Sequence, residues 1–348
     1  MEVLIGCFLH LVGGFAAGSF YIPYKKVKGW SWESYWITGG FFSWLVVPWI
    51  VALLTVPGLF AILHAVDFSV LFWVYFMGVL WGLGGLTFGL TMRYLGMSIG
   101  MSIALGFCSF FGTIIPPLYK GTFIQLFSTP SGLITFAGIL TCVIGIVICG
   151  RGGLRKEREL SEDQKKESIK EFNFTKGLLV AIFSGIMSSC MAFGIAAGKP
   201  MADLAVTMHV NSLWKNSSVL VVVLTGGLTT NFIWCLILNY KNKSAGDYIN
   251  KKTPLLKNYF FAALAGTIWY LQFMFYGMGT TKMGKYDFSS WTLHMAFIIV
   301  FSNMWGIVLN EWKGSSKKTM TVISLGIAVI LFSTVLIGAG SYLVSLGK

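Results

Sequence analysis

The chain of 348 residues is 55% hydrophobic and only 11% charged, and its mean hydropathy is +0.74. A soluble domain carries about 25% charged residues, so this chain lacks the charge to cover a water-facing surface. The net charge of +13 does not indicate nucleic-acid binding, because the basic residues lie between long apolar blocks, where such residues orient membrane proteins. Composition therefore excludes a soluble enzyme and a nucleic-acid-binding protein.

Apolar segments follow one another along the chain, and most have close to the ~20 residues that cross a ~30 Å hydrocarbon core. The first is predicted to be a retained helix rather than a cleaved signal, because Lys25, Lys26 and Lys28 follow it instead of preceding it. The pattern predicts an all-α integral membrane protein. The ten predicted transmembrane helices lie at residues 3–24, 37–54, 70–90, 97–118, 133–149, 177–197, 217–238, 259–279, 288–309 and 321–343.

Lysine and arginine are unevenly divided between the two sides of a ten-helix chain. One side receives 20 of the 26 basic residues, and cytoplasmic loops are the ones enriched in Lys and Arg. Both termini are therefore predicted to lie outside the cytoplasm. The polar stretch 151–173 is predicted to be a cytoplasmic linker between two five-helix units, residues 1–150 and 174–348.

An odd number of helices per unit gives the two units opposite orientations in the membrane. Gly78, Trp81, Phe88, Gly89 and Gly96 recur in register 188 residues later. The matching residues are Gly266, Trp269, Tyr276, Gly277 and Gly284. Inverted repeats that enclose a site near the bilayer midplane are typical of secondary transporters. The sequence thus predicts a carrier built from two inverted five-helix repeats.

The eighth predicted helix carries four side chains on one face. Trp269, Gln272, Phe273 and Tyr276 occupy positions i, i+3, i+4 and i+7, which are neighbours on a helix surface. Gln272 can bind hydroxyl groups without a desolvated charge, and aromatic faces suit the C–H patches of a sugar ring. The alternative is an aromatic belt at the membrane interface, which fits these mid-helix positions less well. The belt readily explains Trp30, Trp32 and Trp36.

The ninth predicted helix repeats this spacing with polar residues. Asp287, Ser290, Trp291 and His294 share one face, and His10 of the first helix is expected at a similar depth. Ionisable side chains at membrane depth are costly and therefore mark functional sites, and histidine changes charge near pH 6.5. We expect Asp287, His294 and His10 to couple protons. The alternative for each histidine is a hydrogen-bonded structural role.

Six residues form the candidate sugar site: Trp269, Gln272, Tyr276, Trp291, Tyr21 and Trp81. Neither a metal site nor a disulfide framework is indicated, because the six cysteines lie in apolar blocks without a Cys-x-x-Cys pair. No His-Glu-x-x-His pattern occurs. We therefore predict no enzyme activity, no metal and no cofactor.

Several segments resemble the L-rhamnose–proton symporter family of the drug/metabolite transporter superfamily. They are Phe20-Tyr-x-Pro-x-Lys-Lys-Val-Lys-x-Trp-Ser-Trp-Glu33, Gly89-Leu-Thr-Met-Arg-Tyr-Leu-Gly-Met-Ser98, Lys199-Pro-Met201, Trp269-Tyr-Leu-Gln-Phe273 and Tyr286-Asp-x-x-Ser-Trp-x-Leu-His-Met295. His10 also lies in a family-like His-Leu-x-Gly segment. The resemblance implies ten helices, a bacterial inner membrane and proton-coupled uptake of L-rhamnose, with L-lyxose and L-mannose as alternative sugars. In such a membrane, the termini predicted to lie outside the cytoplasm are periplasmic.

The resulting hypothesis is a proton-coupled symporter that imports a deoxyhexose by alternating access. Its expected partners are the sugar, protons and the lipid bilayer. The alternative is an uncoupled facilitator or exporter of another small polar metabolite. The scarcity of carboxylates within the predicted helices favours that alternative.

Overall fold

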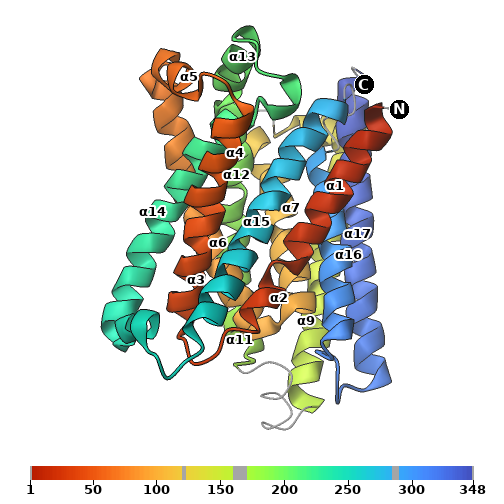
Figure 1. Cartoon of the computed structure of the whole chain (residues 1–348). Helices are drawn as coiled ribbons and strands as arrows, with labels where there is room; N and C mark the ends of the chain where they lie inside the picture. The colour runs from red at the N-terminus through yellow and green to blue at the C-terminus, as the bar shows by residue number, and fades with distance from the viewer. Residues whose placement is uncertain (1, 120–122, 160–170, 284–289, 347–348) are drawn as a thin grey trace.

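The computed structural model describes residues 2–119, 123–159, 171–283 and 290–346 (Figure 1), and within these ranges it is helical and contains no strand. A π-helical turn, Phe42–Val46, joins α3 to α4, and 3₁₀ turns occur at Ser212–Trp214 and Ser244–Ile249. The α-helices are α1 (Glu2–Ser19), α2 (Tyr21–Tyr24), α3 (Trp32–Phe41), α4 (Val47–Thr55), α5 (Leu59–Ala65), α6 (Phe68–Leu95), α7 (Met97–Tyr119), α8 (Gln125–Ser128), α9 (Pro130–Glu159), α11 (Phe174–Ser188), α12 (Cys190–Ala197), α13 (Lys199–Thr207), α14 (Ser217–Asn242), α15 (Leu255–Met283), α16 (Ser290–Val308) and α17 (Lys317–Ser345).

The predicted membrane class is confirmed at the level of a multi-pass helical protein. Among the described residues, eight helical segments are long and apolar enough to cross a membrane. The other two predicted spans fall on α7 and α16, where shorter apolar stretches are found at Met97–Gly112 and Leu293–Val308. The count of ten crossing helices remains a prediction. The predicted linker 151–173 begins as helix, because α9 continues to Glu159.

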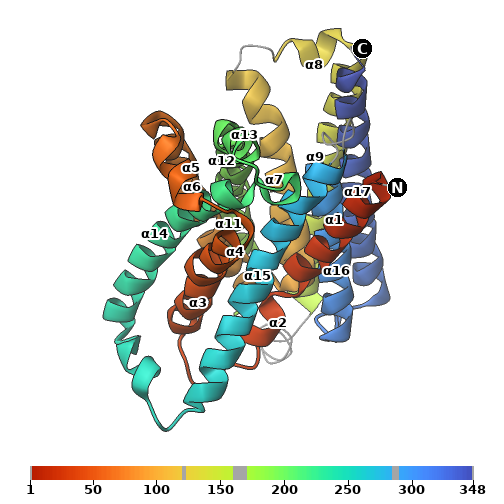
Figure 2. The ribbon, with the colours of Figure 1, turned by 45° about the horizontal axis from the view of Figure 1, so that its top comes forward.

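The long helices form one bundle in which α14 and α17 lie on opposite flanks (Figures 1 and 2). Helix α1 packs against α15 and α16, and α11 packs against α6 and α7. Helix α6 also contacts α14, while α15 contacts α3. The two chain ends lie at the same end of the bundle (Figure 1). Segments far apart in the sequence therefore build its centre.

Glycines let these helices approach closely where lipid provides no hydrophobic drive between them. A Cβ atom on Gly78 of α6 would overlap the carbonyl oxygen of Val223 in α14. A Cβ atom on Gly266 of α15 would likewise overlap the carbonyl oxygen of Gly39 in α3. At both positions a larger side chain would force two backbones apart.

Helices α9 and α17 pack antiparallel through a regular glycine and isoleucine pattern. Gly138, Gly145 and Gly152 recur every seven residues, and added Cβ atoms there would clash with Ile337, Ile330 and Ile323, which run in the opposite order. Each glycine thus leaves space for one branched side chain of the partner helix. Van der Waals packing of this kind drives helix association in membranes.

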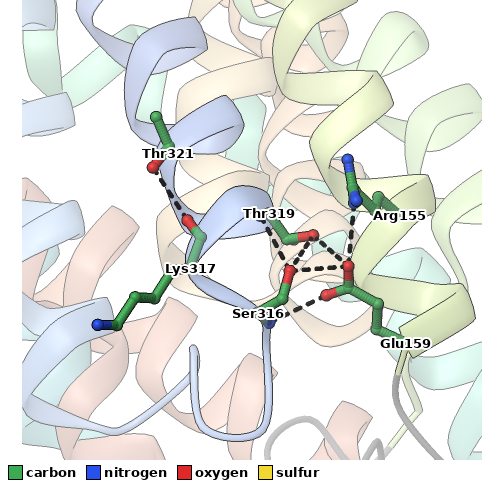
Figure 3. Close-up of polar contacts among 6 residues, drawn as sticks. All are labelled: Arg155, Glu159, Ser316, Lys317, Thr319 and Thr321. Atoms are coloured by element: carbon green, nitrogen blue, oxygen red, sulfur yellow. Dashed lines mark hydrogen bonds and ion pairs between the residues drawn. The ribbon is translucent and has the colours of Figure 1, made fainter.

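Glu159 joins the two helices at the end where α17 begins. Its carboxylate accepts hydrogen bonds from the backbone N–H of Ser316 (3.0 Å) and the hydroxyls of Ser316 and Thr319 (both 2.8 Å), and it pairs with Arg155 at 3.0 Å (Figure 3). These hydrogen bonds, the backbone N–H of Ser316 first, lower the pKa of Glu159 to about 2. The carboxylate therefore caps the N-terminus of α17, as the helix dipole favours.

Candidate functional site

A cavity of about 70 Å³ lies at the centre of the bundle between α1, α6, α7, α11, α12, α15 and α16. Its mostly apolar walls with a few polar groups are typical of small-molecule sites. Six residues singled out from the sequence line it: Trp81, Trp269, Gln272, Tyr276, Trp291 and His294. The structure thus brings together side chains from α6, α15 and α16 that are up to 213 positions apart.

The polar groups of this cavity are few and uncharged. Gln272, Tyr276 and Ser188 supply amide and hydroxyl groups between aromatic, methionine and aliphatic walls. Among the described lining residues there is no carboxylate, lysine or arginine. Such a surface suits a neutral solute that carries both hydroxyl groups and C–H faces.

An aromatic cluster bounds the cavity around Trp269. The indole stacks on Phe20 at a ring-centroid distance of 4.5 Å and lies 5.2 Å from Trp36, 5.3 Å from Trp44 and 6.3 Å from Trp81. Offset and edge-to-face ring pairs at these distances are favourable beyond their burial. The cluster fixes the orientation of Trp269, whose edge remains available to the cavity.

The prediction that Trp30, Trp32 and Trp36 belong to an aromatic belt at the membrane interface is wrong, because side chains of such a belt would be exposed. All three are buried, and Trp36 is 0% exposed. The indole N–H of Trp36 donates to Asn231 Oδ1 at 2.9 Å, and Asn231 in turn donates to the carbonyl oxygens of Gly82 and Gly227. A buried amide that satisfies both an indole and two helix carbonyls locks the register of α3, α6 and α14.

The two histidines meet beside the cavity. His10 and His294 have ring centroids 5.9 Å apart, and Tyr276 lies 5.5 Å from His10 and 5.3 Å from His294. Trp291 packs edge-on against Tyr276 at 5.7 Å. His294 lines the cavity itself, whereas His10 lies behind it against Gly279.

Both imidazoles are buried with unused hydrogen-bonding capacity. His10 is 0% and His294 is 2% exposed. Within the described part of the chain, neither ring nitrogen of His10 has a hydrogen-bond partner, nor does Nδ1 of His294. A buried polar atom without a partner costs about 1–3 kcal/mol. Such atoms in a functional cavity are positioned to take up a proton, a water molecule or a solute hydroxyl.

Two predicted site residues are not placed at the cavity. Tyr21 is buried in α2 and contacts the rings of Phe20 and Tyr24 rather than the cavity. Asp287 lies outside the described residues.

Sequence reasoning overlooked Glu311, a carboxylate that is only 3% exposed. Its oxygens accept the backbone N–H groups of Met97 and Ser98, both at 3.1 Å, and lie 3.5 Å from Lys25 Nζ. The ammonium of Lys156 donates to the backbone carbonyl of Glu311. The carboxylate therefore ties the turn after α16 to the first residues of α7. The sequence signal that could have identified Glu311 is its position as the one acidic residue in a loop that otherwise carries basic residues.

Residues 96–100 match the Gly-x-Ser-x-Gly pattern of serine hydrolases, but their structure is different. Such a serine is exposed on a turn between a strand and a helix. Here Ser98 is buried in the first turn of α7 and donates to Asn303 Oδ1 at 2.5 Å. In the described ranges, no group of three metal-binding side chains is found either.

Comparisons with known proteins identify the family of this chain. The family described as L-rhamnose-proton symport protein (RhaT) matches residues 1–342. The L-rhamnose-proton symporter of Yersinia pestis strain Pestoides F is 40% identical over 342 residues, which are 97% of this chain and 98% of its own length. The L-rhamnose-proton symporter of Klebsiella pneumoniae is 39% identical with the same coverage. No solved structure matches the chain. The aromatic central cavity is thus found in a transporter rather than an enzyme, and the chain belongs to the L-rhamnose-proton symport protein family.

Proposed function

We propose that this chain imports L-rhamnose together with protons by alternating access. The observation that carries the proposal is the meeting of a neutral aromatic cavity with a pair of buried histidines across Tyr276. The names of relatives that are about 40% identical over nearly the whole chain supply the sugar and the ion. In this proposal, the bacterial inner membrane is the location and both termini are periplasmic.

The proposed sugar site consists of Trp81, Trp269, Gln272, Tyr276 and Trp291. A deoxyhexose has hydroxyl groups and an apolar methyl group, so it needs both hydrogen-bonding and apolar walls. Gln272 and Tyr276 would bind hydroxyl groups, while the tryptophans would cover C–H surface.

The proposed proton site is His294 with His10, and Asp287 remains a candidate from the sequence. Imidazole changes charge at ordinary pH, and His294 borders both the sugar cavity and His10. Coupling requires that protonation and sugar binding stabilise the same conformations. Entry of each proton would supply about 2.3 kcal/mol per 100 mV of membrane potential.

The proposed architecture is ten helices in two inverted repeats, with α1, α3, α6, α7 and α9 matched to α11, α14, α15, α16 and α17. This matching is supported by the packing, because each contact has a counterpart. Helix α1 packs against α15 and α16, and its match α11 packs against α6 and α7. Likewise α6 packs against α14, and its match α15 packs against α3. The matched residues Trp81 and Trp269 lie 6.3 Å apart.

Proteoliposomes can test the coupling directly. When L-rhamnose is added without a pre-existing gradient, symport predicts alkalinisation outside and acidification inside, both abolished by an uncoupler. A panel of labelled deoxyhexoses tests the sugar. The His294→Gln variant is expected to equilibrate L-rhamnose but not to accumulate it against a gradient. Wild-type accumulation in this variant would exclude His294 from coupling.

An uncoupled facilitator is the second candidate. It is favoured by the neutral lining of the cavity, which contains no carboxylate among its described residues. Sugar flux without any pH change in the same vesicles would establish it.

A further inference from the structure

A second hollow lies on the flank of the bundle, between α3, α14, the 3₁₀ turn Ser244–Ile249 and the start of α15. It has a volume of about 470 Å³ and shares no lining residue with the central cavity. Its walls are mainly Ile37, Phe41, Phe42, Phe232, Leu236 and Tyr259. Phe41, Phe232, Leu236 and Tyr259 are also exposed on the outside of the bundle, so this groove is open to the surroundings of the protein.

The polar groups of the groove are already satisfied by the protein. Thr38 donates to the carbonyl oxygen of Ser34, and Asn239 donates to the carbonyl oxygen of Cys235 and to the hydroxyl of Tyr248. Asn239 Oδ1 accepts from Ser244 at 3.1 Å. With these groups engaged, the groove offers little to a sugar and suits an apolar occupant.

The chain segment that contains the groove-lining residues Ala245 and Tyr248 is strongly basic. Five exposed lysines follow one another here: Lys241 at the end of α14, Lys243, Lys251 and Lys252 in the connection, and Lys257 at the start of α15. Across the described residues, none of these five lysines forms an ion pair. The one acidic residue of the stretch, Asp247, accepts hydrogen bonds from the backbone N–H of Ser31 and the hydroxyl of Ser34. Five exposed cations therefore remain available on the segment that borders the apolar groove.

We propose that this groove binds one acyl chain of an anionic phospholipid whose headgroup lies on the lysines of the α14–α15 connection. A phospholipid is the occupant that combines an apolar chain with an adjacent anion. Basic sites between transmembrane helices bind anionic headgroups in this way. Because the groove spans α3, α14 and the start of α15, one lipid would contact three helices at once.

Native mass spectrometry of the purified full chain tests this proposal with two lipids of identical chains, dioleoyl-phosphatidylglycerol and dioleoyl-phosphatidylcholine. We expect one phosphatidylglycerol molecule to be retained about tenfold more strongly than phosphatidylcholine, and we expect the double variant Lys251→Gln/Lys252→Gln to abolish this preference. The matched control is Lys317→Gln/Lys318→Gln, which removes the same charge from another adjacent pair.

A second pair of variants tests the groove itself. Ala245→Trp places a large ring among the lining residues, whereas a side chain at the adjacent Gly246 meets nothing within 4 Å. Ala245→Trp should displace the retained lipid, and Gly246→Trp should not. Equal retention of the two lipids by the wild type, or unchanged retention in both Ala245→Trp and the lysine variant, would overturn the proposal.

Discussion

Glu311 is the residue whose removal tests the mechanics of the proposed cycle most directly. Its carboxylate caps the first turn of α7 through Met97 and Ser98. In the proposed architecture α7 and the turn after α16 belong to opposite repeats. In the proposed cycle this contact would hold the two repeats together at this end of the bundle, called the closed end below, and alternating access would require the contact to break. The informative change is Glu311→Ala.

The size of the expected effect of Glu311→Ala follows from the burial of the carboxylate and the geometry of its hydrogen bonds. Glu311 is 3% exposed and accepts two backbone hydrogen bonds of 3.1 Å, and a hydrogen bond to a charged group contributes about 1.5–3 kcal/mol. Removing one partner from a buried charged contact costs about 3–5 kcal/mol, and every ~1.4 kcal/mol changes a population ratio tenfold. We expect Glu311→Ala to shift the balance away from the closed end by at least about 100-fold. Lys25 is 35% exposed, so Lys25→Gln should cost less than about 1 kcal/mol.

Cys108 provides a natural reporter, because it lines the central cavity and is buried. In a chain whose other cysteines are replaced by alanine, a membrane-impermeant thiol reagent is applied from each side in turn. Glu311→Ala should raise Cys108 labelling from the side of the Glu311 contact, and Lys25→Gln should leave it nearly unchanged. The reasoning is refuted if Glu311→Ala lowers thermal stability while labelling from both sides stays as in the wild type.

Three further predictions concern single contacts. Gly78→Ala should destabilise the protein by about 1–3 kcal/mol, because the added Cβ atom would overlap the carbonyl oxygen of Val223. Gly85→Ala should be tolerated, because the nearest atom to its Cβ is a Trp269 carbon at 3.6 Å. The melting temperatures of the two variants in detergent test this difference. Tyr276→Phe should weaken sugar binding about fivefold, because one hydroxyl group in the cavity is lost. Tyr270→Phe is the control, since Tyr270 lies on the same helix but does not line the cavity. The KM for uptake should rise only in Tyr276→Phe. The pKa of Glu159 in the folded protein is about 2, so its capping contribution should be fully present above about pH 4.5 and lost as the pH falls through 2. Over that range the wild type should lose stability at the α9–α17 contact, and Glu159→Gln should not.

The sequence pattern within each segment was sufficient to predict the long apolar helices and one wall of the cavity. A span of apolar residues must form helix inside lipid, because every backbone group has to be satisfied within the segment. The same logic placed Trp269, Gln272 and Tyr276 on one face of α15, and all three line a single cavity. Geometry within one helix is fixed by a rise and a turn angle that do not depend on the rest of the fold.

Contacts between helices were beyond this reasoning. The burial of Trp36 depends on Asn231 of α14 and on the close approach of α6, and neither is encoded in the local sequence around Trp36. Aromatic residues near a helix end are equally common at membrane interfaces, so composition favoured the wrong environment. The partner of Glu311 was hidden for the same reason, since 213 positions separate it from Ser98.

The proposed coupling of the cavity to the closed end follows from two shared helices. Helix α7 lines the cavity through Ala104 and Cys108, and its first turn holds the Glu311 carboxylate. Helix α16 lines the cavity through His294 and Met295, and Glu311 lies just beyond its end. In the proposed mechanism, a solute or proton that shifts α16 against α7 at the cavity would strain the two hydrogen bonds at Glu311. Because packed helices move as rigid elements rather than deforming continuously, we expect a small displacement at His294 to be transmitted to the Glu311 contact.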